Sequence, residues 1–398
     1  MAQTSAEQMR RWQGPALFSF GFRPFFLFGA VWVIVAMSLW LAILAGMLDL
    51  PTQLDRGSWH AHEFLFGYLG AVLAGFLLTA VPNWTGRLPI VGLPLAGLFA
   101  LWCAGRGAIL FSQVLPPLIA PAIDLSFPVA LGGLILREIL AGKNWRNLIV
   151  LALLAVFALA NALFHFEALI GEYAAQGYGL RLGLATAVMM IAVIGGRIIP
   201  SFTRNWLVRE QSAVRPAPPM QFFDKLTLLL SLPILAIWTL APFTVTTGLC
   251  LLVFGILHLM RLTRWQGHHT LSEPLVFFLH ASYAFIPLGG LALGLDQILG
   301  NPDTAGAQHL WMAGAIGAMT LAVMTRATLG HTGHELTAGK ATVAIFVCTF
   351  AAALIRFLTP LNLGLSTLSG VFWLLAFGGF VLVYGPMLLR PKACRSGN

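Results

Sequence analysis

Three side chains that can bind a metal or carry a proton lie together where a long apolar segment begins. His60, His62 and Glu63 precede an apolar run from 64 to 81. That run has about the length needed to cross the hydrocarbon core of a bilayer. Because ionisable groups are costly at such a depth, we expect these three residues to serve a function. The alternative is that they are ordinary polar residues of the headgroup region.

Helical geometry limits how these side chains can share a site. His60 and His62 are two residues apart, which corresponds to about 200° around an α-helix. If this turn is helical, the two imidazoles therefore face different sites. His60 and Glu63 are three residues apart and share a face. Glu63 is a candidate catalytic proton donor, a candidate metal ligand, or a hydrogen-bond partner that orients an imidazole.

Asp124 is a carboxylate inside another apolar segment. It lies in Pro116-Pro117-Leu-Ile-Ala-Pro121-Ala-Ile-Asp124-Leu-Ser-Phe-Pro128, where four prolines predict a broken helix with freed backbone carbonyls. Broken helices at the membrane midplane also occur in transporters. The sequence leaves two roles open for Asp124, a proton relay and a neutral carboxyl group bonded to the freed backbone.

The composition requires a membrane to hold these residues. Of the 398 residues, 58% are hydrophobic and only 9% are charged, whereas soluble domains carry about 25% charged residues. The apolar segments have helical lengths, so we predict an all-α, polytopic membrane protein that forms a single transmembrane domain. The four cysteines form no C-x-x-C pair, so the sequence indicates neither a thiolate metal site nor a disulfide framework.

We predict twelve spans joined by short loops. Their expected ranges are 24–47, 62–82, 91–112, 114–137, 146–167, 178–200, 222–241, 243–261, 273–295, 308–329, 340–358 and 364–388. The N-terminus lacks a signal peptide with a small-residue cleavage site, so we expect the first span to act as an uncleaved anchor.

The distribution of basic residues predicts the orientation. With the N-terminus inside, only four of the 23 Lys and Arg residues fall on the outer side: Arg56, Arg106, Arg181 and Arg356. We therefore expect a multi-pass protein of the bacterial inner membrane with both termini in the cytoplasm. The surplus of positive charge then reflects topology in the lipid bilayer, and we expect no nucleic-acid partner.

The inner ends of three spans resemble one another. Thr85, Thr203 and Thr332 align, each after an aromatic residue or a histidine, and the spans that carry them are four apart. This pattern predicts three parallel repeats of four helices, over 20–140, 141–265 and 270–390. The same offset aligns His62 with Leu180 and with His309 at the outer ends. We therefore expect His62 and His309 to point into one shared outer centre, and His60 and Glu63 to turn toward a neighbouring one.

The other histidines fall into groups along the predicted spans. Imidazole suits iron, copper and zinc, and it is the usual axial ligand of haem. No H-E-x-x-H or H-x-x-E-H motif occurs, so metal ligands must come from several helices. The expected outer ligands are His60, His62, His165 and His309. The expected inner candidates are His258, His280 and His331, whereas His268 and His269 lie in an inner loop where we expect them to be solvated.

Two arginines recur at equivalent places in the sixth and tenth spans. Arg197 and Arg326 both lie near the predicted inner ends. Guanidinium groups pair well with carboxylates, including haem propionates, so both residues are candidates for cofactor binding. The alternative is that each is a positive anchor that reaches toward the headgroups.

The chain resembles the NnrS family of bacterial membrane proteins over nearly its whole length. The resemblance rests on these segments: Phe20-Gly-Phe-Arg-Pro-Phe-Phe26, His60-Ala-His-Glu63, Gly75-Phe-Leu-Leu-Thr-Ala-Val-Pro-Asn-Trp-Thr-Gly86, Gly196-Arg-Ile-Ile-Pro-Ser-Phe-Thr203, and His309 with Thr325-Arg-Ala-Thr-Leu-Gly-His-Thr-Gly333. Where many relatives carry Arg after Thr-Gly, this chain has His334. The resemblance implies a twelve-span protein that carries haem b with copper or non-haem iron and that acts in nitric oxide metabolism and nitrosative stress.

Three functions follow from these features. The first is an oxidoreductase that reduces nitric oxide to nitrous oxide, with quinol as the expected electron donor. The second is a protein that binds nitric oxide or a metal as a sensor or scavenger without turnover. The third is a transporter, which the predicted broken helix, the repeats and Asp124 favour.

Overall fold

The twelve predicted spans are confirmed. The computed structural model describes residues 12–87, 89–301, 303–359 and 364–392. Within these residues all regular structure is helical, and twelve helices are long and apolar enough to cross a membrane. Most boundaries lie within a few residues of the expected ones. The second span begins earlier, at Arg56, and the sixth continues further, to Arg209.

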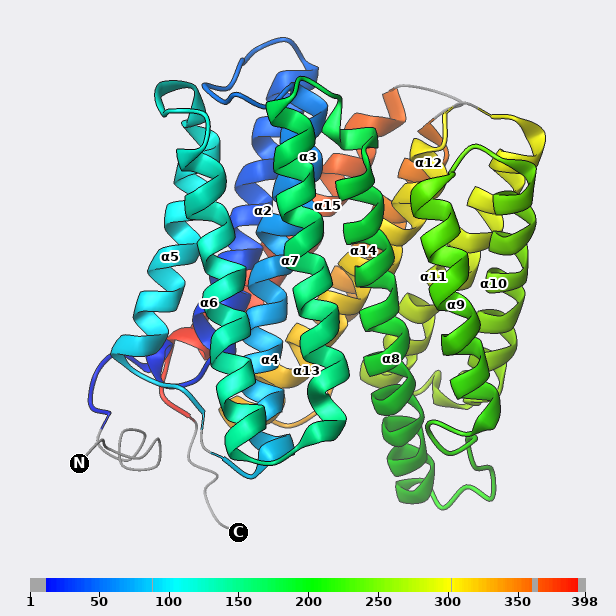
Figure 1. The fold of residues 1–398 in the computed structure, drawn as a ribbon. Helices are drawn as coiled ribbons and strands as arrows, with labels where there is room; N and C mark the ends of the chain where they lie inside the picture. The colour runs from blue at the N-terminus through cyan, green and yellow to red at the C-terminus, as the bar shows by residue number, and fades with distance from the viewer. Residues whose placement is uncertain (1–11, 88, 302, 360–363, 393–398) are drawn as a thin grey trace. The chain divides into compact units, whose positions relative to one another are not determined.

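The chain divides into two compact units, each described by itself. The first comes from residues 1–183, 327–335 and 380–398. Its helices are α2 (Phe22–Leu44), α3 (Arg56–His62), η2 (Glu63–Tyr68), α4 (Leu69–Thr85), α5 (Leu93–Leu110), α6 (Ile119–Ala141) and α7 (Leu148–Leu169) (Figure 1). Within this unit α4 packs against α2 and α6, and α6 also packs against α5 and α7.

The second unit comes from residues 184–326 and 336–379. It contains most of α8 (Tyr178–Arg209) and of α13 (Met319–Thr332), and the first part of α15 (Gly364–Leu389). The helices that lie wholly inside it are α9 (Phe222–Leu240), α10 (Val245–Thr263), α11 (Pro274–Leu299), α12 (Ala305–His309), η7 (Leu310–Ala318) and α14 (Lys340–Phe357). α10 packs against α9 and α11, and η7 packs against α11 and α14.

Small residues bring α10 and α11 close together. A Cβ atom added to Gly248 would lie 2.8 Å from the carbonyl oxygen of Gly294, and one added to Gly294 would lie 2.8 Å from the carbonyl oxygen of Gly248. Any side chain at either position would therefore separate the two backbones. Close approach through glycine is a common way for membrane helices to gain packing energy.

The expected break in the fourth span is wrong. α6 is continuous from Ile119 to Ala141, and only Pro128 lies in its interior. Pro116 and Pro117 precede the helix, and Pro121 lies in its first turn, where the missing N–H would have had no partner within the helix. Asp124 therefore lies in the second turn of a regular helix, near its beginning rather than its middle.

The aligned span ends share local structure. The hydroxyl groups of Thr85, Thr203 and Thr332 each donate to the carbonyl four residues earlier, over 2.9, 2.9 and 2.7 Å. At the opposite ends, α3 stops at His62 and α12 stops at His309, and each is followed by a π-helical stretch, η2 or η7. α8 is α-helical throughout. The division into three repeats stays a prediction.

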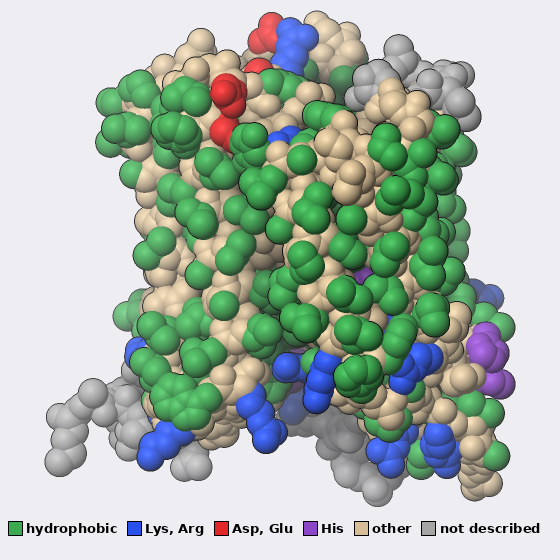
Figure 2. Space-filling model, turned by 45° about the vertical axis from the view of Figure 1, so that its right-hand side comes forward, with side chains coloured by type: hydrophobic (Ala, Val, Ile, Leu, Met, Phe, Trp, Pro, Cys, Tyr) green, Lys and Arg blue, Asp and Glu red, His purple; other side chains and the backbone are tan. Residues whose placement is uncertain are grey.

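The surface agrees with burial in a bilayer. Figure 2 shows hydrophobic side chains along the middle of the spans, whereas Lys and Arg side chains lie at the ends of spans. Individual exposed apolar residues include Leu93, Leu229 and Leu382, which are 79%, 65% and 79% exposed. Lipid chains are the natural solvent for such side chains.

Candidate metal centre

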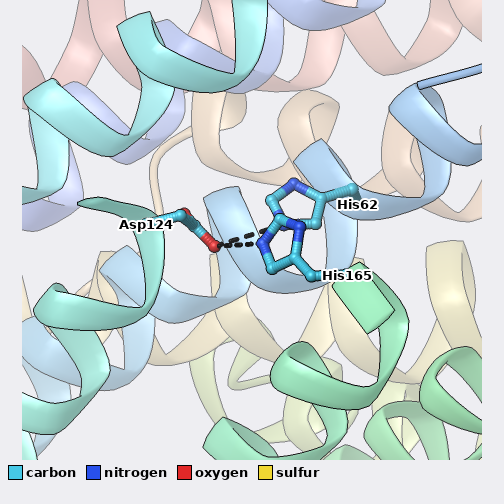
Figure 3. Close-up of side chains that lie close together, drawn as sticks. All are labelled: His62, Asp124 and His165. Atoms are coloured by element: carbon cyan, nitrogen blue, oxygen red, sulfur yellow. Dashed lines mark hydrogen bonds and ion pairs between the residues drawn. The ribbon is translucent and has the colours of Figure 1, made fainter. Parts of the chain in front are cut away.

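The carboxylate of Asp124 lies between two imidazoles in the first unit. Its Oδ2 is 3.3 Å from Nε2 of His62 and 3.0 Å from Nε2 of His165. Figure 3 shows the carboxylate facing both rings, which come from separate helices. All three residues are buried, with 2%, 0% and 4% of Asp124, His62 and His165 exposed. We call these three residues the His62–Asp124–His165 cluster.

Local sequence places each member. Asp55 accepts a hydrogen bond from the backbone N–H of Ser58 over 2.9 Å and so caps the start of α3. This cap fixes the short helix that ends at His62. On α7, Asn161 and His165 are four residues apart and therefore share a face. That shared face brings both side chains to Asp124 on α6.

Glu63 holds the His62 ring. Its Oε1 lies 2.9 Å from Nδ1 of His62 and accepts from Nη1 of Arg106 over 2.6 Å, while its Oε2 accepts from Nε1 of Trp32 over 2.7 Å. The expectation that Glu63 turns away toward a neighbouring centre is wrong. Three N–H donors surround a carboxylate that can only accept, which favours orientation of His62 over proton donation as the role of Glu63.

Asn161 and Arg106 complete the cluster's surroundings. The amide of Asn161 donates to Oδ2 of Asp124 over 2.7 Å, and its carbonyl oxygen lies 3.1 Å from Nε2 of His62. Arg106 donates to the other carboxylate oxygen, Oδ1 of Asp124. Both carboxylates of the site are thereby tied to one guanidinium, which fixes three helices relative to one another within this unit.

A count of charges and donors shows what the site requires. Glu63 and Asp124 bring two carboxylates, whereas Arg106 brings one guanidinium, and all three are buried. A buried net charge is costly, so one further positive charge is needed. Both ring nitrogens of His62 face oxygen acceptors. A second proton on His62, or a monovalent metal ion such as Cu⁺ that replaces this proton at Nε2, supplies the charge, whereas a divalent ion exceeds the requirement by one.

The donor set fits a metal ion. Two imidazole nitrogens and one carboxylate oxygen offer ligand atoms that all lie within 4.8 Å of one another. Ligands at roughly 2.0–2.2 Å from one ion are about 3 Å apart, and Oδ2 of Asp124 lies 3.3 and 3.0 Å from the two imidazole nitrogens. Two histidines with one carboxylate are a typical set for non-haem iron, and imidazole also suits copper. The Glu63–His62 bond supplies the carboxylate that commonly orients a metal-bound histidine.

The other outer histidines lie apart from this cluster. His60 stacks on Trp40 with ring centres 4.4 Å apart and also packs on Phe64, so His60 and His62 face different surroundings, as the helical spacing predicted. His309 Nδ1 lies 2.6 Å from the carbonyl oxygen of Ala305. His309 belongs to the second unit, and the centre expected for it together with His62 stays a prediction.

His258 belongs to a buried chain of hydrogen bonds in the second unit. Arg261 donates to Oδ1 of Asp224 over 2.7 Å and to the hydroxyl of Tyr283 over 3.0 Å. The hydroxyl of Ser231 donates to the carbonyl of Thr227, so it accepts from Nε2 of His258, 3.0 Å away. In the neutral imidazole Nδ1 then accepts from the hydroxyl of Tyr283, 2.8 Å away. Binding a metal at His258 would require one of these bonds to break.

The remaining inner candidates lie in varied surroundings. His280 Nε2 is 2.7 Å from the hydroxyl of Thr203, and its Nδ1 is buried without a hydrogen-bond partner among the described residues. The ring of His331 lies 5.5 Å from those of both Phe20 and Phe22. No interaction described here brings these histidines together as one centre.

The remaining polar candidates are the two arginines and the loop histidines. Arg326 stacks over the ring of Phe202 at 4.1 Å, and Arg197 lies half-buried in α8. His268 and His269 are exposed in the loop, as expected. A role for Arg197 or Arg326 in cofactor binding stays a prediction.

Sequence reasoning missed two partners of the cluster. Arg106 was counted as an outer topological charge, but only 4% of it is exposed and it binds both carboxylates. Its position inside an apolar segment was the signal that could have identified it. Asn161 was not singled out, although its spacing of four from His165 places both on one helix face.

Comparison with known families agrees with the resemblance in sequence. A family model described as NnrS protein matches residues 16–392, which is nearly the whole chain. The match begins before α2 and ends after α15, so it includes every residue of the His62–Asp124–His165 cluster. No curated protein matches the chain.

Proposed function

The chain belongs to the NnrS family, and on this premise we propose that it is a membrane oxidoreductase that reduces nitric oxide to nitrous oxide. The observation that supports the proposal is the His62–Asp124–His165 cluster, a buried set of donors suited to copper or non-haem iron. Nitric oxide is small and apolar, so it can reach a buried centre through lipid. The localisation proposed is the bacterial inner membrane.

The reaction sets the requirements for the site. Two nitric oxide molecules, two electrons and two protons give one nitrous oxide and one water. The metal would bind nitric oxide and exchange electrons, while His62, Asp124 and His165 would hold it. Glu63 fixes the ring of His62, and Arg106 keeps both carboxylates in place. Quinol is the proposed electron donor because it is soluble in the same bilayer.

We also propose that the protein binds haem b, although fewer of the expected histidines are suitable as its axial ligands. Both nitrogens of His258 are bonded, and a Cβ atom on Gly267 would lie 2.6 Å from Nδ1 of His280, so these two packed rings do not fit an axial ligand as they stand. His309 remains the candidate axial ligand, because the bond of its Nδ1 to the carbonyl of Ala305 orients the ring in the way usual for a metal-binding histidine. Haem would supply an additional site for electron transfer.

Loss of one ligand tests the proposal. We expect His165→Ala to lower the metal content per protein and to abolish nitrous oxide production, because Asp124 and His62 alone offer too few ligands. Metal is measured by mass spectrometry and nitrous oxide by gas chromatography on purified, reduced protein. His268→Ala, which removes an exposed histidine, is the matched control. Full nitrous oxide production by His165→Ala would exclude the cluster as the reaction centre.

A sensor or scavenger is the second candidate. Both nitrogens of His62 and both carboxylate oxygens of Asp124 are already bonded within the protein. A fully satisfied polar network is rigid, which suits a site that binds a ligand without turnover. Nitric oxide binding in the absence of any nitrous oxide would favour this function. The third function, a transporter, loses its main support because α6 is a continuous helix.

The proposed orientation has its own test. Arg56 lies at the beginning of α3 with 64% of its side chain exposed. In a protein whose natural cysteines are replaced by alanine, we expect Arg56→Cys to react with a membrane-impermeant maleimide added to the outer side of intact cells. Arg146→Cys, an exposed position beside α7, should react only after the membrane is opened. The reverse pattern would invert the topology.

A further inference from the structure

A small apolar pocket lies beside the metal-binding cluster in the first unit. It is formed between α4, α6 and α7. Its walls are apolar apart from a single amide: they consist of Phe66, Gly70, Leu73, Phe127, Pro128, Leu131, Leu154, Phe157 and Asn161. The three helices that form it are the ones that carry or adjoin the cluster.

The one polar wall residue connects the pocket with the cluster. Asn161 is 4% exposed, and its amide contacts Asp124 and His62 over 2.7 and 3.1 Å. A molecule in the pocket would therefore lie one side chain away from the donors. We propose that this pocket binds a diatomic gas molecule, nitric oxide in the proposed reaction, next to the metal centre; this identity of the ligand rests on the proposed function.

The size and walls favour such a ligand over water. The centre of a water-sized molecule has about 10 Å³ available, which is close to the space that one small molecule needs. A buried water requires two to four polar partners, whereas this pocket offers only Asn161, whose amide groups are already bonded. An apolar diatomic molecule needs no such partners and loses little on leaving lipid.

The pocket would serve a reaction that consumes two molecules of gas. A molecule held beside the centre meets the reacting atoms without a new encounter from the bilayer. The aromatic rings of Phe66 and Phe157, whose centres are 5.2 Å apart, both line the space.

Gly70 allows the pocket to be filled without disturbing the fold. A Cβ atom at this position would lie 3.8 Å from the ring of Phe127, an ordinary contact, so Gly70→Ala adds a methyl group that the site accepts. Alanine also favours a helix more than glycine does. Gly132→Ala on α6 is the matched control, because a Cβ atom there meets no atom within 4 Å.

We expect Gly70→Ala to lower kcat/KM for nitric oxide several-fold, with an unchanged metal content and an unchanged rate at saturating gas. Gly132→Ala should behave as the parent protein does. If kcat/KM of Gly70→Ala equalled that of the parent protein, the proposal that the pocket binds nitric oxide would be wrong, whereas the proposed reductase activity would be unaffected.

Krypton binding tests the pocket independently of the proposed reaction. Crystals of the parent protein pressurised with krypton should show the atom between α4, α6 and α7, and crystals of Gly70→Ala should not. This result requires no turnover, so it can support the pocket even if no nitrous oxide is formed. An empty pocket in the parent, or equal occupancy in both proteins, would overturn the inference.

Discussion

Asp124→Asn is expected to lose the bound metal and to lower the free energy of unfolding by about 1–3 kcal/mol, the usual cost of leaving a buried hydrogen-bonding group without its partner. Asparagine has the same shape but lacks the negative charge. Arg106 would then keep Glu63 as its only carboxylate partner, and both imidazoles would lose the negative charge between them. Metal content and the melting temperature of the purified protein measure the two effects.

The same substitution at an exposed position is the control. Asp49 pairs with Arg56, but 80% of its side chain is exposed, and exposed pairs contribute little to stability. Asp49→Asn should therefore leave metal content and melting temperature almost unchanged. If Asp124→Asn kept both its metal content and its melting temperature, the metal would be bound elsewhere, and the cluster would be an ordinary polar network.

Arg261→Met is expected to be more destabilising than Asp124→Asn, but in the second unit and without any effect on the metal of the first. Arg261 and Asp224 are 0% and 1% exposed and are joined by a 2.7 Å bond. Removing only the guanidinium leaves a buried carboxylate unpaired, which costs about 3–5 kcal/mol. It also removes a donor from the hydroxyl of Tyr283. Thermal unfolding followed by circular dichroism measures the loss.

A double-mutant cycle separates the ion pair from simple packing. Asp224→Asn together with Arg261→Met removes both charges, so the double variant should be more stable than Arg261→Met alone. Asparagine can still accept the backbone N–H of Gln221 that Asp224 accepts at the start of α9. Additive losses in the two single variants would show that Asp224 and Arg261 are not coupled, and the stabilisation would then not come from the ion pair.

The sequence by itself determined the membrane architecture. Lipid requires each span to satisfy its backbone internally and to be apolar over a fixed length, and both properties can be recognised along the chain without knowledge of its contacts. All twelve spans were therefore expected near their observed positions. The same logic identified His62 and Glu63, because ionisable groups in an apolar segment stand out. Helical spacing also separated His60 from His62 correctly.

Only the tertiary structure decided which polar groups meet. His62 and Asn161 are 99 residues apart in the chain, and Glu63 and Arg106 are 43 apart, so no periodicity within one span could pair them. Asp124 looked like a residue of a broken helix because proline counts do not reveal where a helix begins. The contacts of Arg106, Asn161 and His165 depend on how α5, α6 and α7 pack, because a buried charge selects its partner across helices and not along one of them.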